Sequence, residues 1–233
     1  MADPWELAKK AAARKAVEEV RAGQRIALGT GSTAAWVVRE IAGRFPDGGG
    51  VECVASSRAT ERLARSLGLT VRELQSADRF DLMIDGADEA TPSLNLLKGG
   101  GGALFREKLL AQLSRRRVIV VDASKIVRHL GESHPIPVEV VPFARPVLLP
   151  AFERRRFRAV LRRTASGEPF ITDNGNEIVD LTPPGPIGDA RALAEELRSE
   201  TGVVETGIFC GLADRIVVGQ ANGETDEFVR PEG

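Results

Sequence analysis

The sequence of 233 residues contains only two cysteines and two histidines. Cys53 and Cys210 lie far apart and have apolar neighbours, which is typical of buried, reduced thiols. This scarcity excludes a disulfide framework and argues against a cysteine-based metal centre. His129 and His134 lie at or near a proline-punctuated segment, where a hinge or surface role is favoured, and they lack the helical spacing of a ligand pair. We therefore expect no bound metal ion.

The chain also lacks an excess of either charge and any long hydrophobic run. Its formal net charge is −1 and its isoelectric point is near 6.2, which indicates no basic surface for nucleic acid or an anionic membrane. No segment approaches the length of a membrane span, and the N-terminus carries charged residues in place of an apolar signal core. We expect a cytoplasmic protein with neither nucleic acid nor membrane as partner.

The residues that are present favour an α/β fold. Hydrophobic residues make up 42% of the chain, which is enough for a sizeable core over two domains. Apolar runs end near residues 28, 55, 85 and 121, and each is followed by small, hydroxyl or charged residues. This pattern predicts a Rossmann-like, open, mostly parallel sheet, in which ligands bind beyond the carboxyl ends of the strands. A helix is predicted before the first strand, at 3–21, with Asp3 as its cap.

A second, smaller α+β domain of the ferredoxin-like kind is predicted after the proline-punctuated connector 131–137. We place it at residues 131–206 and the α/β domain at 1–130 and 207–233. Its predicted elements are a strand at 138–143, a helix at 146–157 that contains Pro150, strands at 158–163, 169–172 and 177–181, and a helix at 189–200. The segments 203–209 and 215–219 are predicted strands that rejoin the first domain or bridge both.

The stretch from Phe80 to Lys108 concentrates reactive side chains. Its apolar run ends at Asp85, a second carboxylate follows at Asp88, and Lys98 precedes four glycines and a predicted helix that carries Glu107. Glycine amides and a helix N-terminus stabilise an anion or a developing oxyanion, and Lys98 adds a full charge. Glu107 is a candidate general base, because burial raises the pKa of a carboxyl toward the working pH.

A purely structural interpretation fits each of these residues taken alone. Asp85 and Asp88 are also suited to a turn, and Glu107 is suited to a solvated helix face beside Arg106. The ensemble favours a site, because a structural turn requires neither four consecutive glycines nor a lysine that leads into them.

A second candidate region is the loop Gly29-Thr30-Gly31-Ser32-Thr33, between a predicted strand and a predicted helix. Backbone N–H groups and the hydroxyls of such a loop form a phosphate cradle, although a glycine-rich connector with a capped helix is the alternative. With Ala34 the loop also matches the dinucleotide fingerprint, but the next apolar run ends in serines and not in the acidic residue that holds a ribose. Lys125 follows the strand near 121 as a second cation, and Lys9 or Lys10 is a further candidate.

At these positions the chain resembles ribose-5-phosphate isomerase of type A. The resemblance rests on GTGST at 29–33, DGADE at 85–89, KGGGGALxREK at 98–108 and DASK at 122–125, with VEVVPFA at 138–144 and TDNGN at 172–176 in the second domain. It implies an aldose-ketose isomerase that interconverts D-ribose 5-phosphate and D-ribulose 5-phosphate in the non-oxidative pentose phosphate pathway. The resemblance further implies that the enzyme uses no metal or cofactor and forms a homodimer or homotetramer.

The resemblance also implies roles for single residues. Glu107 would move a proton through a cis-enediolate that Lys98 and the glycine amides stabilise, while Asp85 and Asp88 would hold sugar hydroxyls or assist ring opening. Ser32, Thr33 and Lys125 would bind the phosphate. The implied substrate-binding set is Thr30, Gly31, Ser32, Thr33, Asp85, Gly86, Ala87, Asp88, Lys98, Gly99, Gly100, Gly101 and Lys125. Phe105 and Pro150 depart from the family pattern and put only packing in question.

Three other functions compete with this prediction. A sugar-phosphate sensor coupled to DNA binding would need a helix-turn-helix or a basic arm, and neither is evident in the sequence. A nicotinamide dehydrogenase would need the missing acidic ribose partner. Related sugar-phosphate isomerases and deaminases are the nearest enzymatic alternative, which an assay of amino sugars against pentoses would separate.

Overall fold

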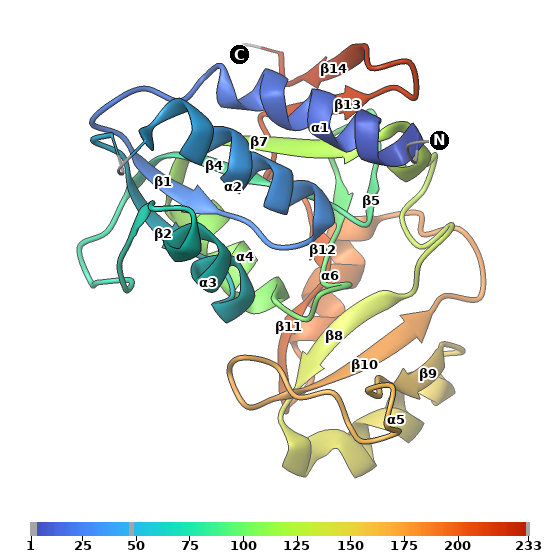
Figure 1. The fold of residues 1–233 in the computed structure, drawn as a ribbon. Coiled ribbons are helices and arrows are strands. Elements are labelled where there is room, and N and C mark those ends of the chain that lie inside the picture. Colours follow the sequence, from blue (N-terminus) through green and yellow to red (C-terminus); the bar gives the residue numbers. More distant parts are fainter. Residues whose placement is uncertain (1–3, 47–48, 232–233) are drawn as a thin grey trace.

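The computed structural model of the protein describes residues 4–46 and 49–231. Its main feature is a seven-stranded sheet in the order β14-β13-β7-β4-β1-β2-β3 (Figure 1). The strands are β1 (Arg25–Leu28), β2 (Glu52–Ala55), β3 (Thr70–Val71), β4 (Phe80–Asp85), β7 (Ser114–Asp122), β13 (Arg215–Gly219) and β14 (Thr225–Val229). All neighbours are parallel except β13 and β14. The predicted open, mostly parallel sheet is confirmed.

Helices cover both faces of this sheet because successive strand residues point to opposite sides. Ile26 and Leu28 of β1 pack with α1 (Pro4–Val17) and α2 (Ser32–Arg44), whereas Ala27 packs with α4 (Leu104–Leu113). The helix α3 (Arg58–Ser66) lies against α2.

The first helix is shorter than predicted. It ends at Val17, and the chain continues through tight turns in which the N–H groups of Glu19 and Val20 donate to the carbonyls of Ala16 and Val17. Asp3, the expected cap, lies outside the described residues.

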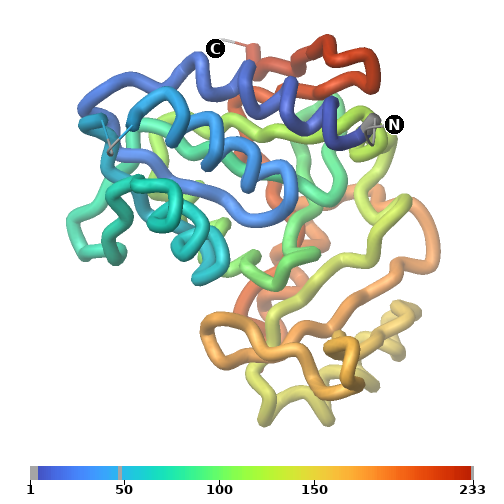
Figure 2. The backbone as a smooth tube through the Cα atoms, in the orientation of Figure 1, coloured from blue at the N-terminus to red at the C-terminus, as the bar shows by residue number. Residues whose placement is uncertain are grey.

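A second sheet of four antiparallel strands, in the order β11-β8-β10-β9, lies beneath the first (Figure 2). Its elements in chain order are β8 (Ile136–Val140), α5 (Arg145–Arg154), β9 (Arg158–Leu161), β10 (Glu177–Thr182), α6 (Ala190–Arg198) and β11 (Val203–Thr206), and the short helix η3 (Pro142–Ala144) precedes α5. This β-α-β-β-α-β arrangement is the ferredoxin-like one that we predicted. The sheet spans 136–206. The domain boundaries at 131 and 207 stay a prediction.

Several details differ from the prediction. The strand predicted at 138–143 is β8 at Ile136–Val140 and gives way to η3, and the helix predicted at 146–157 ends at Arg154. The segment 169–172 forms only isolated bridges, from Pro169 to Arg163 and from Ile171 to Glu177, and is not a strand. The segment 203–209 divides into β11 and β12 (Ile208–Phe209). The strand β12 pairs with β6 (Leu96–Leu97), which also pairs with β5 (Glu89–Ala90), in a small sheet that we did not predict. Short strands of two residues carry too little periodicity to be recognised in a sequence.

The divided segment changes sheets at Gly207. Its N–H donates to the carbonyl of Pro137 at 2.7 Å, and its own carbonyl accepts from the N–H of Lys98 at 2.8 Å. A Cβ atom at this position would lie 2.2 Å from the carbonyl oxygen of Lys98. The backbone therefore passes here only without a side chain, and this close approach joins the two sheets beside Lys98.

The connector between the sheets is held by Glu89, which is fully buried. Its carboxylate accepts hydrogen bonds from the N–H groups of Gly131 and Ser133 at 2.6 Å and of His134 at 2.7 Å. His134 therefore belongs to the junction, as the sequence predicts. A buried carboxylate needs such donors because its desolvation is otherwise very unfavourable.

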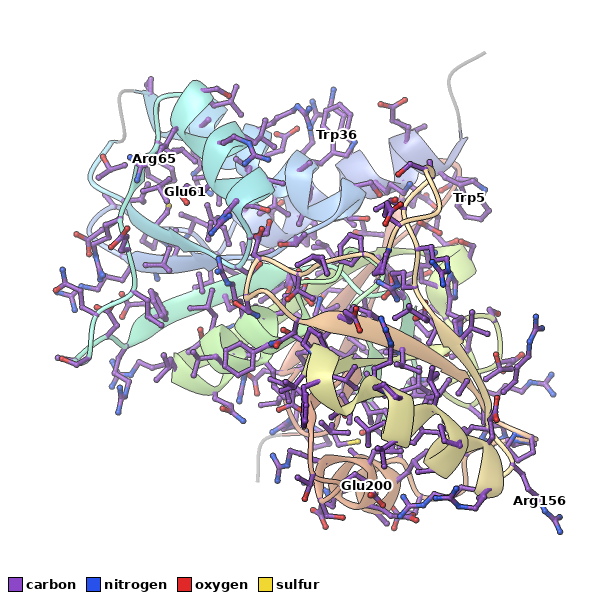
Figure 3. All side chains as sticks on the ribbon, turned by 90° about the horizontal axis from the view of Figure 1, so that it is seen from below. Trp5, Trp36, Glu61, Arg65, Arg156 and Glu200 are labelled. Carbon is purple, nitrogen blue, oxygen red and sulfur yellow. The ribbon has the colours of Figure 1, made fainter. Side chains whose placement is uncertain are left out.

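Both cysteines are free. Cys53 is buried as expected, and burial raises the pKa of its thiol to about 12, whereas Cys210 is only partly buried. Arg156 at the end of α5 extends away from the protein, while Glu61 and Arg65 lie side by side on α3 (Figure 3). Among the described residues, no helix is both long and apolar enough to cross a membrane.

We predict opposite effects for two glycine-to-alanine changes. In Gly219→Ala the new Cβ would lie 1.9 Å from the carbonyl oxygen of Ala8 in α1, whereas nothing lies within 4 Å of a Cβ at Gly43 in α2. We expect Gly219→Ala to lower the free energy of unfolding by roughly 1–3 kcal/mol through overpacking. Gly43→Ala should raise it by about 0.5–1 kcal/mol. Urea unfolding midpoints measure both, and equal midpoints would contradict the predicted contact between α1 and β13.

Candidate active site

A cavity of about 150 Å³ lies beyond the carboxyl ends of β1 and β4. It is lined by Lys9, Thr30, Gly31, Ser32, Thr33, Gly86, Ala87, Asp88, Lys98, Gly99, Gly100, Gly101, Glu107 and Lys125. Segments that are far apart in the sequence therefore meet here, as expected at the edge of a parallel sheet. Every residue of the predicted site lines this cavity except Asp85, which lies behind its wall.

One end of the cavity is built to receive an anion. The helix α2 begins at Ser32, and Gly31 precedes it with φ of 110° and no side-chain cap, so its first backbone N–H groups are open to a ligand. Lys125 is placed by the short helix η2 (Ala123–Lys125), which Asp122 caps by accepting from the N–H of Ser124 at 3.1 Å. The helix N-terminus and the lysine both favour negative charge at this end.

The two candidate lysines of the N-terminal helix, Lys9 and Lys10, point in different directions. Lys9 lines the cavity, whereas Lys10 points to the other side of α1, where its Nζ lies 5.2 Å from the centroid of the Trp36 ring. Figure 3 labels Trp36 on α2. Consecutive helical residues point about 100° apart, so only one of the two reaches the cavity.

The carboxylate of Asp85 is fully buried at the end of β4. One oxygen accepts from the N–H groups of Thr30 at 3.0 Å and Gly86 at 2.7 Å, and the other lies 2.9 Å from the Nζ of Lys98. A Cβ at Gly29 would lie 1.9 Å from this carboxylate, so the loop approaches it only because position 29 is glycine. Burial raises the pKa of Asp85, and the charge of Lys98 and the N–H donors oppose that rise.

Lys98 is the centre of the charged groups. Its Nζ donates to the carbonyl of Gly86 and forms ion pairs with Asp85 at 2.9 Å and with Glu107 at 3.5 Å. Only 3% of the side chain is exposed. Burial alone would lower the pKa of this lysine, but the adjacent carboxylates of Asp85 and Glu107 raise it. The ammonium therefore stays charged in the wall of the cavity.

Glu107 lies in the first turn of α4, and its side chain is 4% exposed. Burial raises its pKa to about 8, against the attraction of Lys98. One ammonium cannot neutralise two buried carboxylates, so the more weakly held of the two retains a proton more easily. The Oε2 atom is buried and has no hydrogen-bond partner in the part of the chain that the structure describes. This combination is that of a poised proton acceptor.

The glycine loop completes the wall. The N–H of Gly100 donates to Asp88 at 2.7 Å, and a Cβ at Gly100 would lie 2.6 Å from that carboxylate. The N–H of Gly102 donates to the carbonyl of Gly99. The amides of Gly99 and Gly101 remain as candidates for binding an oxyanion. Within the described ranges, no cluster of three or more His, Cys, Asp or Glu residues is arranged to hold a metal ion.

Sequence reasoning missed the role of Lys108, next to the candidate base. Its buried Nζ donates to the side chain of Glu205 and the carbonyl of Thr206, both at 2.7 Å, and to the carbonyl of Ile208 at 2.9 Å. These contacts tie α4 to β11 and β12. No local signal predicts them, because the partners follow about a hundred residues later in the chain.

A parallel sheet whose strand ends carry an anion pocket beside a buried lysine and a carboxyl with a raised pKa defines an α/β enzyme suited to proton transfer on a small anionic substrate. The sequence model described as "Ribose 5-phosphate isomerase A (phosphoriboisomerase A)" matches residues 52–223. The chain belongs to the ribose 5-phosphate isomerase A family and is an isomerase of that family.

Similar proteins cover nearly the whole chain. Ribose-5-phosphate isomerase A of Synechococcus sp. is 45% identical over 225 residues, which are 96% of this chain and 97% of that protein. The Deinococcus radiodurans protein of the same name is 42% identical over 222 residues, which are 94% and 96% of the two chains.

Solved structures agree with the fold. The Plasmodium falciparum ribose 5-phosphate isomerase is 34% identical with a TM-score of 0.93, and the alignment covers 97% of this chain and all of the other. A D-ribose-5-phosphate isomerase in complex with phospho-erythronic acid is also 34% identical, with a TM-score of 0.92 and coverage of 97% and 99%.

We predict that the two early lysines differ in anion binding. Lys9→Met should weaken the binding of inorganic phosphate about tenfold, since a charge-assisted contact contributes roughly 1.5–3 kcal/mol. Lys10→Met is the matched control and should bind phosphate like the wild type, because its ammonium lies over Trp36. Isothermal titration calorimetry measures both affinities, and an equal loss in the two variants would contradict the assignment of Lys9.

Proposed function

We propose that the enzyme interconverts D-ribose 5-phosphate and D-ribulose 5-phosphate through a cis-enediolate, with Glu107 as the base. The observation that carries this proposal is the buried Glu107 carboxyl group, 3.5 Å from Lys98 in a cavity whose other end favours an anion. A base with its pKa near 8 and a fixed cation beside it suit proton abstraction next to a carbonyl group.

In the direction from the aldose, Glu107 takes the proton from C2 of the open-chain sugar. The electrons of the broken C2–H bond form the C1–C2 double bond, and the C1 carbonyl oxygen becomes negative. The same carboxyl group returns the proton to C1, while the hydroxyl proton of C2 moves to the oxygen of C1 and leaves a ketone at C2. A single base suffices because C1 and C2 are adjacent atoms in the plane of the cis-enediolate, and the Glu107 carboxylate serves both from the same face of that plane.

Lys98 and the amides of Gly99 and Gly101 stabilise the enediolate oxygens. These donors are already in place before the reaction, so little reorganisation accompanies the appearance of charge. Asp88 lines the cavity and binds a sugar hydroxyl or assists ring opening. Asp85 lies behind the wall, so we assign it the orientation of Lys98 and of the Thr30 loop in place of a direct sugar contact.

The phosphate lies at the N-terminus of α2, with Ser32, Thr33, Lys9 and Lys125 around it. Phosphate binding by backbone N–H groups at a helix N-terminus is a general feature of such loops. A relative in complex with phospho-erythronic acid, which carries a phosphate and a carboxylate, supports a sugar phosphate as the ligand class. The proposed mechanism uses no metal or cofactor, and a homodimer or homotetramer remains a prediction from the family.

Glu107→Gln is expected to fold normally and to lose turnover by about 10² to 10⁴, the usual contribution of a general base. The measurement is conversion of ribose 5-phosphate to ribulose 5-phosphate by purified protein in the presence of a chelator. Wild-type activity under these conditions supports a metal-free reaction. A variant with near-normal turnover would show that another group is the base, and a wild type that binds the sugar phosphate without turnover would favour a sensor.

The raised pKa of Glu107 predicts a specific pH dependence. The base acts only when deprotonated, so kcat/KM should rise with pH through the region near 8. The folded state also holds this proton more strongly than the unfolded chain, so the contribution of Glu107 to stability should fall as pH rises from about 4.5 to about 8. Glu107→Gln is the control and should lack that part of the stability change. A kcat/KM that is independent of pH between about 6 and about 10, roughly two units on either side of the pKa, would contradict the prediction.

A further inference from the structure

Arg162, immediately after β9 in the ferredoxin-like sheet, contacts the glycine loop of the cavity. Its Nη1 donates to the carbonyl of Gly99 at 2.7 Å and to the carbonyl of Gly100 at 3.0 Å. No motif in the sequence pointed to this residue. Arg162 thus connects the ferredoxin-like part of the chain to the backbone of the glycine loop, which forms the wall of the cavity at the parallel sheet.

The contact sets the direction of the loop amides. In a planar trans peptide the C=O and the N–H point in opposite directions. The Gly99 carbonyl shares a peptide with the N–H of Gly100, and the Gly100 carbonyl shares one with the N–H of Gly101. Arg162 holds both carbonyls on its own side, so both N–H groups point away from it. The first reaches Asp88 at 2.7 Å, and Gly101 lines the cavity.

Arg162 is itself firmly held. Its Nε donates to Asp180 of β10 at 2.9 Å and its Nη2 donates to the other oxygen of the same carboxylate. Its Cζ lies 5.9 Å from the centroid of the Phe170 ring, and that ring lies 2.3 Å from where a Cβ of Gly102 would be. The side chain is 15% exposed. A bidentate pair with a carboxylate fixes the plane of the guanidinium and hence the positions of its remaining N–H groups.

A loop of four glycines depends on such external contacts. Glycine has more backbone freedom than any other residue, so Gly99–Gly102 gain little orientation from their own conformational preferences. A cation on the carbonyl side also polarises each peptide and strengthens the N–H on the opposite side as a donor.

We propose that Arg162 is a positioning residue that aims the Gly100 and Gly101 amides at Asp88 and at the enediolate oxygen. The inference rests on the isomerase reaction proposed above, and it gives the ferredoxin-like sheet a part in catalysis: Arg162 acts through the loop and does not touch the substrate. Binding of the phosphate at α2 does not depend on it.

The test compares Arg162→Met with Arg163→Met. Arg163 is exposed, and among the described residues its side chain donates only to the carbonyl of Gly167 in its own hairpin, so it is a matched control. We expect Arg162→Met to lower kcat on the order of 10²-fold, as a misplacement of about 1 Å in a site does, with a much smaller change in KM. The kcat of Arg162→Lys should lie between those of the wild type and Arg162→Met, because one ammonium cannot hold Asp180 and two carbonyls together.

A binding measurement separates positioning from a loss of structure. Phospho-erythronic acid carries a carboxylate whose two oxygens and charge resemble those of an enediolate, whereas inorganic phosphate tests only the anion pocket. Arg162→Met should weaken the binding of phospho-erythronic acid at least about tenfold and leave the binding of inorganic phosphate unchanged. The inference is overturned if Arg162→Met loses the same factor of affinity for both ligands, or if its kcat stays within about twofold of the wild type. A tenfold change in affinity corresponds to about 1.4 kcal/mol.

Failure of the isomerase proposal gives a different result. Absence of turnover in the wild type would refute that reaction, and the ratio of the two ligand affinities in Arg162→Met would still support or overturn the orientation of the loop by Arg162.

Discussion

The site depends on one buried ammonium group that faces two buried carboxylates. Lys98 holds Asp85 at 2.9 Å and Glu107 at 3.5 Å, and all three side chains are nearly or fully removed from water. Burial of a charge is strongly unfavourable unless it is paired and hydrogen-bonded, and a lysine compensates only one carboxylate fully. Asp85 also accepts from two backbone N–H groups, whereas none of the described residues donates a backbone N–H to the Glu107 carboxylate, so the two differ in how readily they hold a proton. In the reaction that we propose, this difference makes Asp85 a structural anion and Glu107 the base.

Both sheets contribute contacts that hold Lys98, Asp85 and Glu107 in place. The parallel sheet supplies Asp85 and the helix N-terminus at its carboxyl edge, where aligned strands bring distant segments together. The ferredoxin-like sheet supports α4 from the other side, through Glu205 on Lys108 and through Asn174, whose side chain accepts from the Nε of Arg106 at 2.7 Å. The residues on both sides of the proposed base are thus anchored to the ferredoxin-like part of the chain, whereas Asp85 lies on the parallel sheet. Groups that must keep a fixed geometry are best placed between such rigid supports.

Much of the fold and of the cavity follows from local patterns. The end of the first strand was predicted at its observed position, residue 28, because a short apolar run that breaks into Gly-Thr-Gly has few other interpretations. Most residues of the cavity could also be predicted from the sequence, because they lie in loops directly after strands. Lys98 and Glu107 were recognised together because they share one loop and the helix that follows it. The less regular segments were predicted poorly. The segment 169–172 has apolar residues but forms only bridges, and the strands of two residues left no pattern in the sequence.

The sequence alone determined which reactive groups exist and on which strand ends they lie, since hydrophobic periodicity and glycine placement are local properties. Tertiary structure alone decided which of them face the cavity. The packing of α1 against β7 and β13 turns Lys9 inward and Lys10 toward Trp36. The close approach of Gly29 buries Asp85 behind the wall. The hairpin that follows β9 brings Arg162 to carbonyls some sixty residues earlier in the chain. Contacts over such separations depend on how the sheets pack together, and no window of the sequence contains that information.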